Sequence, residues 1–174
     1  APGDIGDGRA ALSVALSSKA PRRIAYASDS FDDPPEVHAG LLTTAPPPAV
    51  TTINADLGQA WGKTQSVEWN SGGMQVQGWL MYPADYDAHK RYPMIVYVHG
   101  GPSWANLPTW RNNASALSEF GYFVLMPNPR GSFGEGVAFA QAIRNQMGYG
   151  DLDDILAGVD AVEKLAPIDD HRLG

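Results

Sequence analysis

Residues 99–102, His-Gly-Gly-Pro, come directly after an apolar run of strand-forming residues, PMIVYV. The glycine pair strips side chains from the backbone where a buried strand ends, which is where open α/β sheets bind their ligands. Bare peptide N–H groups at that place can donate hydrogen bonds to the oxygen that becomes negative during acyl transfer. The motif therefore predicts an oxyanion hole. The alternative, a turn that only redirects the chain, is disfavoured by the neighbouring segments described below.

Acyl transfer also needs a nucleophile, which many serine hydrolases carry in Gly-x-Ser-x-Gly on a strained strand-to-helix turn. Ser132 comes closest, in Arg-Gly-Ser-Phe-Gly, but arginine holds the first position and no buried strand leads directly into a helix. Ser103, in Gly-Pro-Ser-Trp-Ala, does not fit either. We predict that neither serine is a nucleophile.

The sequence shows no pattern that indicates a metal site or a cofactor site. The chain has no cysteine, which excludes disulfides, thiolate metal sites and a cysteine nucleophile. His38 and His89 are predicted to be solvated. His171 follows Asp169 and Asp170, but adjacent residues in a turn rarely converge on one ion. We therefore predict no metal site and no cofactor.

The elements that must position the glycine pair begin near Ser66. The segment SVEWNSGGMQVQGWLMYP is typical of an antiparallel hairpin that turns at residues 71–73. The run PMIVYVHGG that follows has the composition of a strand covered on both faces. The motif is thus expected at the end of a buried strand.

Two further elements follow the motif. A helix is predicted from Trp110 to Phe120, with Gly121 at its end. Its apolar positions are Ala114, Leu117 and Phe120. YFVLMPNPRG, from Tyr122 to Gly131, is predicted as a second buried strand that Pro127 and Pro129 stop.

Two more helices are predicted after that strand. Ser132 and Glu135 have the spacing of a capping box, which would open a helix reaching about Gln146. Asp151 is the predicted N-cap of the next helix, which Pro167 ends. That helix has an apolar stripe of Leu152, Ile155, Val159, Val162 and Leu165. The final DDHRLG comes where another strand should begin.

The order strand, helix, strand, helix, strand predicts an α/β fold with parallel pairing and right-handed crossovers, after the antiparallel hairpin. Residues 1–60 differ, with short strand-like pieces at Arg22–Phe31 and Glu36–Leu42. Three consecutive prolines within residues 43–52 exclude helix and central strand there. We predict a β-rich domain over 1–60 and an α/β domain over 61–174.

Composition narrows the class of partner. The chain has 174 residues, 44% hydrophobic and 18% charged, with a net charge of −7. Such a chain is globular, and its acidity argues against a nucleic acid or an anionic membrane as partner. No apolar run approaches the ~20 residues of a membrane span. No targeting segment follows Ala1, so a cytoplasmic, periplasmic or secreted location stays open, and we expect the chain to begin after processing or inside a longer polypeptide.

Four segments, in this order and spacing, resemble the prolyl oligopeptidase family. The branch most similar contains the acylaminoacyl peptidases and bacterial dipeptidyl aminopeptidases. The segments are YPMIVYVHGGPSW, FGYFVLMPNPRGSFGEG, MGYGDLDDILAGVDAVEKL and DDHRLG. Residues 22–52 resemble, more weakly, the last blade of that family's β-propeller. The resemblance implies a serine hydrolase that cleaves peptides near their amino end, with a propeller that filters access by size.

The resemblance also implies roles for single residues. Gly101 would donate its N–H to the oxyanion, and Gly100 would keep the approach open. His99, Pro102 and Arg130 would support the active site, with Arg130 bracing the loop behind it and His99 structural and not the catalytic base.

Other residues are assigned to the helix and to the substrate. By the same resemblance, Asp151 and Asp154 would cap and anchor a core helix. Trp104 and Trp110 follow the oxyanion loop and are candidates for a substrate pocket.

In the family, DDHRLG runs directly into the strand that carries the nucleophile, and the acid and the histidine come later. We therefore expect the catalytic Ser, Asp and His after Gly174, and no activity from this chain alone. Two alternatives remain: a carboxylesterase or lipase, since HGG loops serve that chemistry too, and an inactive fragment that acts only by association. Cleavage specificity stays open.

The expected partners are a peptide substrate and either the remainder of the same polypeptide or a complementary chain that completes the sheet. An unpaired sheet edge tends to pair with another strand. A homo-oligomer is also possible.

Overall fold

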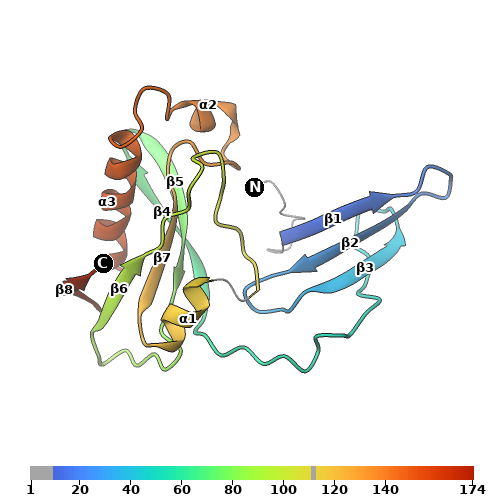
Figure 1. The fold of residues 1–174 in the computed structure, drawn as a ribbon, viewed down its shortest axis with the longest axis horizontal. Helices are drawn as coiled ribbons and strands as arrows, with labels where there is room; N and C mark the ends of the chain where they lie inside the picture. Colours follow the sequence, from blue (N-terminus) through green and yellow to red (C-terminus); the bar gives the residue numbers. More distant parts are fainter. Residues whose placement is uncertain (1–9, 111–112) are drawn as a thin grey trace. The chain divides into compact units, whose positions relative to one another are not determined.

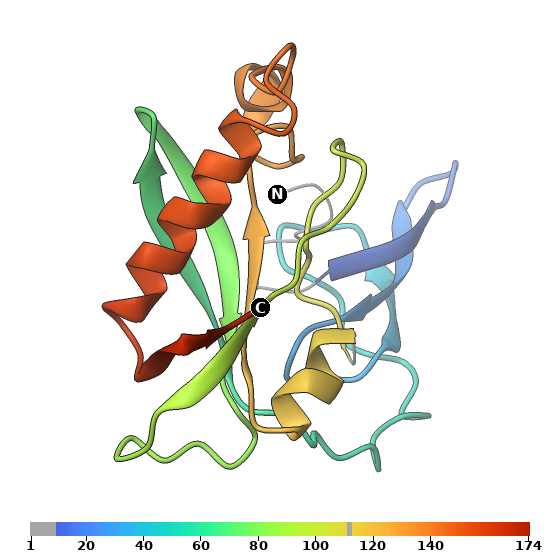
Figure 2. The same ribbon diagram turned by 60° about the vertical axis from the view of Figure 1, so that its left-hand side comes forward.

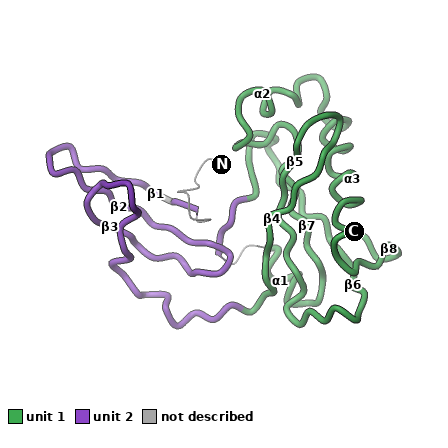
Figure 3. Tube along the Cα trace, turned by 180° about the vertical axis from the view of Figure 1, so that it is seen from behind, with its two compact units in different colours: residues 1, 60–106, 112–174 green, residues 2–59, 107–111 purple. Residues whose placement is uncertain are grey.

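The computed structural model describes residues 10–110 and 113–174. The chain forms two compact units: unit 1 is residues 1, 60–106 and 112–174, and unit 2 is residues 2–59 and 107–111 (Figure 3). Within the described ranges, unit 1 contains a five-stranded sheet and three helices, and unit 2 a three-stranded sheet.

The sheet of unit 1 has the strand order β4-β5-β7-β6-β8 (Figure 1). β4 pairs antiparallel with β5, and β5 antiparallel with β7, whereas β6 runs parallel to both β7 and β8. The strands are β4 (Thr64–Ser71), β5 (Met74–Met81), β6 (Tyr92–Val96), β7 (Phe123–Asn128) and β8 (Ile168–Leu173). The prediction of a mixed α/β fold is confirmed.

The hairpin of β4 and β5 is formed as predicted. Gly72 and Gly73 join the two strands with φ of 56° and 79°. Positive φ at both turn positions matches the twist of the flanking strands, and glycine adopts it without a steric penalty. Val67 and Trp69 are buried while Glu68 between them is exposed, so one face of the hairpin enters the core.

The two central strands differ in how completely they are covered. Every residue of β7 is buried. In β6, Tyr92 and Met94 are buried, but Ile95 and Val96 are only half-buried. The prediction of a second buried strand is confirmed, whereas β6 is less covered than predicted.

Pro127 does not stop β7 but lies inside it. The last pair between β6 and β7 is Val96 with Leu125, so no described strand pairs with β7 on that side at Pro127. The missing N–H of proline is tolerated there because no ladder hydrogen bond requires it. The carbonyl oxygen of Pro127 accepts a hydrogen bond from Asn106 Nδ2 at 2.9 Å.

Helix α3 (Gly150–Glu163) packs against the sheet through small residues. A Cβ atom at Gly158 would lie 2.6 Å from Cζ2 of Trp69, so the close packing of helix and strand requires glycine. The predicted apolar stripe is therefore wrong at its ends, because Leu152 and Leu165 are 49% and 59% exposed. Because the ring of Trp69 is bulky, α3 approaches the sheet only with the face that carries Gly158. The buried residues of that face are Gly150, Asp154, Gly158 and Val162.

Two predicted caps are wrong. Helix α3 begins at Gly150, with Tyr149 at the N-cap position, so Asp151 lies inside the helix and is not its cap; its carboxylate accepts the N–H of Gly148 at 2.7 Å. Helix α2 (Gly136–Gln141) is shorter than predicted and has no side-chain cap. Ser132 is not that cap because the helix begins at Gly136, with Glu135 at the N-cap position, and the Ser132 hydroxyl is instead hydrogen-bonded to His99.

Helix α1 (Asn113–Glu119) covers the other side of the sheet from α3 (Figure 2). The predicted start at Trp110 borders residues 111–112, which lie outside the described residues. Gly121 ends the helix as predicted, with N–H of Gly121 donating to Ser118 O and that of Tyr122 to Leu117 O. Phe120 is 80% exposed and does not belong to the buried face, which Ala114, Ser115 and Ser118 form.

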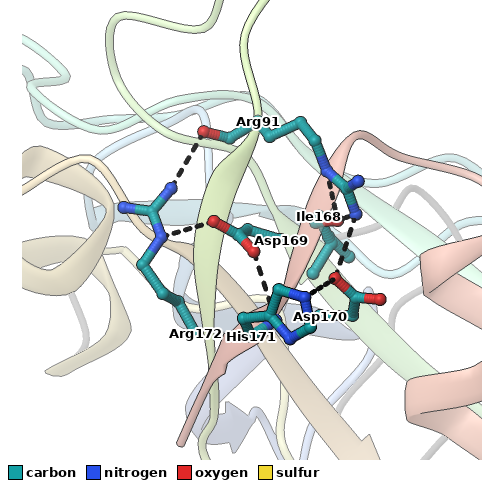
Figure 4. A network of polar contacts seen from close by, with 6 residues as sticks. All are labelled: Arg91, Ile168, Asp169, Asp170, His171 and Arg172. Carbon is teal, nitrogen blue, oxygen red and sulfur yellow. Dashed lines mark hydrogen bonds and ion pairs between the residues drawn. The ribbon is translucent and has the colours of Figure 1, made fainter.

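β8 pairs with β6 only at its two ends, Ile168 and Leu173, so residues 169–172 bulge outward. Arg172 Nε donates to Asp169 Oδ2 at 2.6 Å, and Arg91 Nη2 donates to Ile168 O at 2.6 Å (Figure 4). The hydrogen bond from Arg172 lowers the pKa of Asp169. The expected strand forms, and two arginines hold its polar bulge.

Unit 2 is an antiparallel sheet in the order β1-β2-β3. Its strands are β1 (Ala10–Leu16), β2 (Arg23–Asp29) and β3 (Glu36–Leu41). The two predicted strand pieces are confirmed as β2 and β3, whereas β1 was not predicted. Ala49 pairs with His38, and Val50 N–H donates to Val37 O at 2.7 Å, so residues 48–50 follow the outer edge of β3.

Candidate active site

The glycine loop, residues 99–106, leaves the carboxyl end of β6 in unit 1. Gly100 and Gly101 are exposed, and within the described part of the chain their N–H groups have no protein acceptor. The φ of Gly101 is 139°, a conformation that residues with a Cβ rarely adopt. A Cβ there would lie 3.0 Å from Ser103 N, whereas one on Gly100 would meet no atom within 4 Å. The loop thus has two exposed glycines whose backbone donors have no acceptor in the described part of the chain, at the position where we predict an oxyanion hole.

His99 attaches the beginning of the glycine loop to the chain after β7. Its Nε2 lies 2.9 Å from Ser132 Oγ, and its Nδ1 lies 3.1 Å from Gly100 O. With the proton on Nδ1, the ring donates to Gly100 O and accepts from the Ser132 hydroxyl. The pairing suits the supporting role that the resemblance assigns to His99.

The middle of the loop has a second attachment. Pro102, joined to Gly101 by a cis peptide bond, accepts the N–H of Trp104 at its carbonyl oxygen, at 2.8 Å. The carbonyl oxygen of Trp104 in turn accepts the N–H of Phe133 at 2.9 Å. The segment after β7 therefore holds the loop both at His99 and at Trp104.

Arg130 and Asp154 form a buried ion pair behind this segment. Arg130 Nη2 lies 2.6 Å from Asp154 Oδ1, Arg130 Nε 2.9 Å from Oδ2, and the Arg130 backbone N–H donates to Oδ2 at 2.8 Å. Burial by itself would raise the pKa of Asp154, but the hydrogen bonds from Arg130 and Ser71 outweigh it and lower the pKa. The hydrogen bond to Asp154 raises the pKa of Arg130. The pair ties α3 to the end of β7.

The two tryptophans of the predicted pocket fall in different units. Trp104, in unit 1, is 60% exposed. Trp110 belongs to unit 2, where its backbone N–H donates to Asp29 Oδ2 at 2.9 Å. Their contribution to a substrate pocket stays a prediction.

Neither serine that resembles a nucleophile occupies a suitable place. Ser132 is 1% exposed, and its N–H donates to Pro129 O at 3.0 Å in a turn that follows β7. Ser103 is exposed in the glycine loop, and neither serine lies between a strand and a directly following helix.

The other histidines lie away from the loop. His89 is exposed, as predicted. His38 is half-buried and stacks on Tyr26 with ring centroids 5.3 Å apart, so the prediction of a solvated side chain was wrong. His171 is 91% exposed, and within the described residues no three metal-ligating side chains come together. Over the same residues, no helix has both the length and the apolar character to cross a membrane.

Sequence reasoning missed the residues that hold the end of the glycine loop. Asn106 contacts Asn128 and Trp79 through hydrogen bonds of 2.7–3.3 Å. Asn128 ends a buried strand and Asn106 lies in a loop, and asparagine is ordinary in both places. The two residues are 22 positions apart in the chain, so no local sequence pattern indicates that they pair.

Comparison with known proteins gives a family match for the last part of the chain. Residues 108–174 match the prolyl oligopeptidase family. The chain is 42% identical over 103 residues to the uncharacterized peptidase YuxL of Bacillus subtilis, covering 59% of this chain and 16% of that protein. It is 41% identical over 83 residues to dipeptidyl-peptidase 5 of Aspergillus fumigatus, covering 47% of this chain and 12% of that protein. The chain thus spans less than a fifth of the length of these relatives.

Solved structures show the same fold. Acylaminoacyl peptidase of Pyrococcus horikoshii matches 98% of this chain and 27% of its own with a TM-score of 0.84 and 23% identity. A puromycin-hydrolyzing peptidase of Mycobacterium tuberculosis matches 97% of this chain and 32% of its own, with a TM-score of 0.77 and 21% identity. Residues 108–174 thus match the prolyl oligopeptidase family, and the chain is similar to peptidases in sequence and in fold.

Proposed function

We propose that this chain contributes the oxyanion-hole loop of a serine peptidase, in which Gly101 N–H is a donor to the tetrahedral intermediate. The observation that carries the proposal is that Gly101 is exposed and that its N–H has no acceptor among the described residues, in a loop attached at His99 and Trp104. Donors that are already fixed in place stabilise developing charge without a reorganisation cost.

In the proposed reaction a serine outside these 174 residues attacks the peptide carbonyl carbon. The carbonyl electron pair moves to oxygen, and that oxyanion accepts the hydrogen bond from Gly101. A histidine, also from elsewhere in the protein, takes the serine proton and gives it to the leaving amine. Gly100 has no Cβ and leaves room for the substrate. We propose Trp104 as an apolar wall for a substrate side chain, since it is 60% exposed and lies in the glycine loop, three residues after Gly101.

Unit 2 fits a blade of a propeller. Its three antiparallel strands and residues 48–50 along β3 have the meander order of a four-stranded blade. We therefore keep the proposal of a β-propeller-like domain over 1–60 and a partial α/β-hydrolase domain over 61–174. β8 pairs only with β6 among the described strands, so its free edge can accept a further strand of the same polypeptide or of a partner.

The choice between a peptidase and an esterase can be tested with the full-length protein. We expect cleavage of aminoacyl- and peptidyl-p-nitroanilides as well as p-nitrophenyl esters, since the relatives are peptidases. Cleavage of esters without any cleavage of anilides would favour a carboxylesterase, and failure to cleave either would favour a protein that acts only by association.

A fluorophosphonate probe tests where the nucleophile lies. We expect the probe to label one serine of the full-length protein, and mass spectrometry of the labelled peptide to place it outside residues 1–174. The physical reason is that Ser132 is only 1% exposed and therefore out of reach of the probe, and that no hydrogen bond joins Ser103 to a base among the described residues. Label on the peptide that contains Ser103 or Ser132 would refute the assignment.

A further inference from the structure

Asn106 is the last residue of the glycine loop, and both its backbone and its side chain form hydrogen bonds. Its backbone N–H donates to Asn128 Oδ1 at 2.7 Å, and its Nδ2 donates to Pro127 O at 2.9 Å. Its carbonyl oxygen accepts from Trp79 Nε1 at 2.9 Å and from Asn128 Nδ2 at 3.3 Å. Asn106 is thereby fixed to the end of β7 and to β5.

Asn128 is the centre of these contacts. It is the last residue of β7 and is 6% exposed. Its Oδ1 faces a backbone N–H, which can only donate, and its Nδ2 lies 2.7 Å from Gln77 Oε1 and 3.3 Å from Asn106 O. The chemistry of these neighbours fixes the orientation of the carboxamide. An aspartate would keep the acceptor but would lose the donor and set a charge against a carbonyl oxygen.

Little else supports the loop between its ends. Gly100, Gly101, Ser103 and Trp104 are exposed, Pro102 is half-buried, and Ala105 is the buried residue between the two ends. A segment with few buried contacts opens readily unless its attachments hold it. The described attachments are His99 to Ser132 at the beginning, Trp104 to Phe133 in the middle and Asn106 to Asn128 at the end.

We infer that Asn128 is a positioning residue, which holds Asn106 and thereby fixes where the Gly101 N–H points. Its effect on catalysis rests on the proposed function of the glycine loop, whereas its effect on the order of that loop does not. Asn128 itself touches neither the proposed oxyanion nor the substrate.

The test uses Asn128→Ala, Asn128→Asp and, as a matched control, Asn70→Ala in the full-length protein. Asn70 is an exposed asparagine on β4 of the same sheet. Amide hydrogen exchange of the peptide covering residues 99–106 should be faster in Asn128→Ala by about fivefold, the factor expected for one net hydrogen bond. The kcat for an anilide substrate should fall about 30- to 100-fold, as for a misplaced catalytic group, with KM changed less than about threefold. Asn70→Ala should match wild type in both.

The partial variant separates positioning from general destabilisation. Asn128→Asp keeps the acceptor for Asn106 N–H, so we expect exchange and kcat between those of wild type and Asn128→Ala. Unchanged exchange at residues 99–106 in Asn128→Ala overturns the inference, and so does faster exchange with an unchanged kcat. A wild-type protein without peptidase activity refutes the proposed function instead, and the exchange measurement then decides the inference alone.

Discussion

Replacing Gly101 by alanine in the full-length protein should lower kcat for a peptide substrate by about 100- to 1,000-fold, the usual loss for one oxyanion donor, with little change in KM. The φ of Gly101 is 139°, which an alanine adopts only under strain. Its Cβ would also lie 3.0 Å from Ser103 N and 3.3 Å from Trp104 Cβ. The loop must shift, and the N–H that we assign to the oxyanion shifts with it.

Two further glycines make this result interpretable. Gly58 lies in unit 2, and a Cβ there would meet no atom within 4 Å, so Gly58→Ala should behave as wild type. Gly100 is equally open and lacks a positive φ, so Gly100→Ala should leave the loop in place and should affect substrate entry (KM) more than kcat. Steady-state kinetics with an anilide substrate checks all three variants. A Gly101→Ala variant with wild-type kcat would rule out Gly101 as a donor.

Replacing Asp154 by alanine should cost unit 1 about 3 to 5 kcal/mol of stability, since it leaves the other member of a buried ion pair without its partner. Asp154 is fully buried and accepts three hydrogen bonds from Arg130. Asp153→Ala is the matched control, because Asp153 is exposed on the same turn of α3 and should change stability by no more than about 0.5 kcal/mol. Urea unfolding followed by tryptophan fluorescence reports the loss.

The same pair predicts a pH dependence. Because the folded state lowers the pKa of Asp154, the unfolded state binds the proton more readily, and the contribution of the pair is complete above the unfolded pKa near about 4. It is lost as the pH falls through the lower, folded pKa. Wild type should therefore lose stability with acid more steeply than Asp154→Ala. Parallel curves for the two proteins would contradict this role of Asp154.

Glycines with local effects were the most informative part of the sequence. The hairpin turn at Gly72 and Gly73, the end of α1 at Gly121 and the glycine loop all lie where sequence reasoning places them. Each depends on the φ that one or two residues adopt, so neighbouring residues suffice to indicate it. The buried strand β7 was equally easy to predict, because a short continuous run of apolar residues is typical of a strand covered on both faces.

Patterns that depend on a distant partner were misinterpreted. Ser132 has the spacing of a cap, but its hydroxyl pairs with His99, 33 residues away. The leucines of α3 suggested an apolar stripe, but Trp69 on β4 admits only the face that carries Gly158. In both cases the interaction involves a side chain from a distant part of the chain. The spacing of residues within one short segment therefore cannot indicate it.

The sequence by itself determined that a strand ends in bare peptide groups at Gly100 and Gly101, because loss of Cβ is a property of the residue. Only the tertiary structure decided what holds those groups in place: Ser132 for His99, and Asn128 for Asn106. A hydrogen bond between residues far apart in the chain forms only when the sheet brings its donor within about 3 Å of its acceptor, and strand order, not local composition, sets that distance.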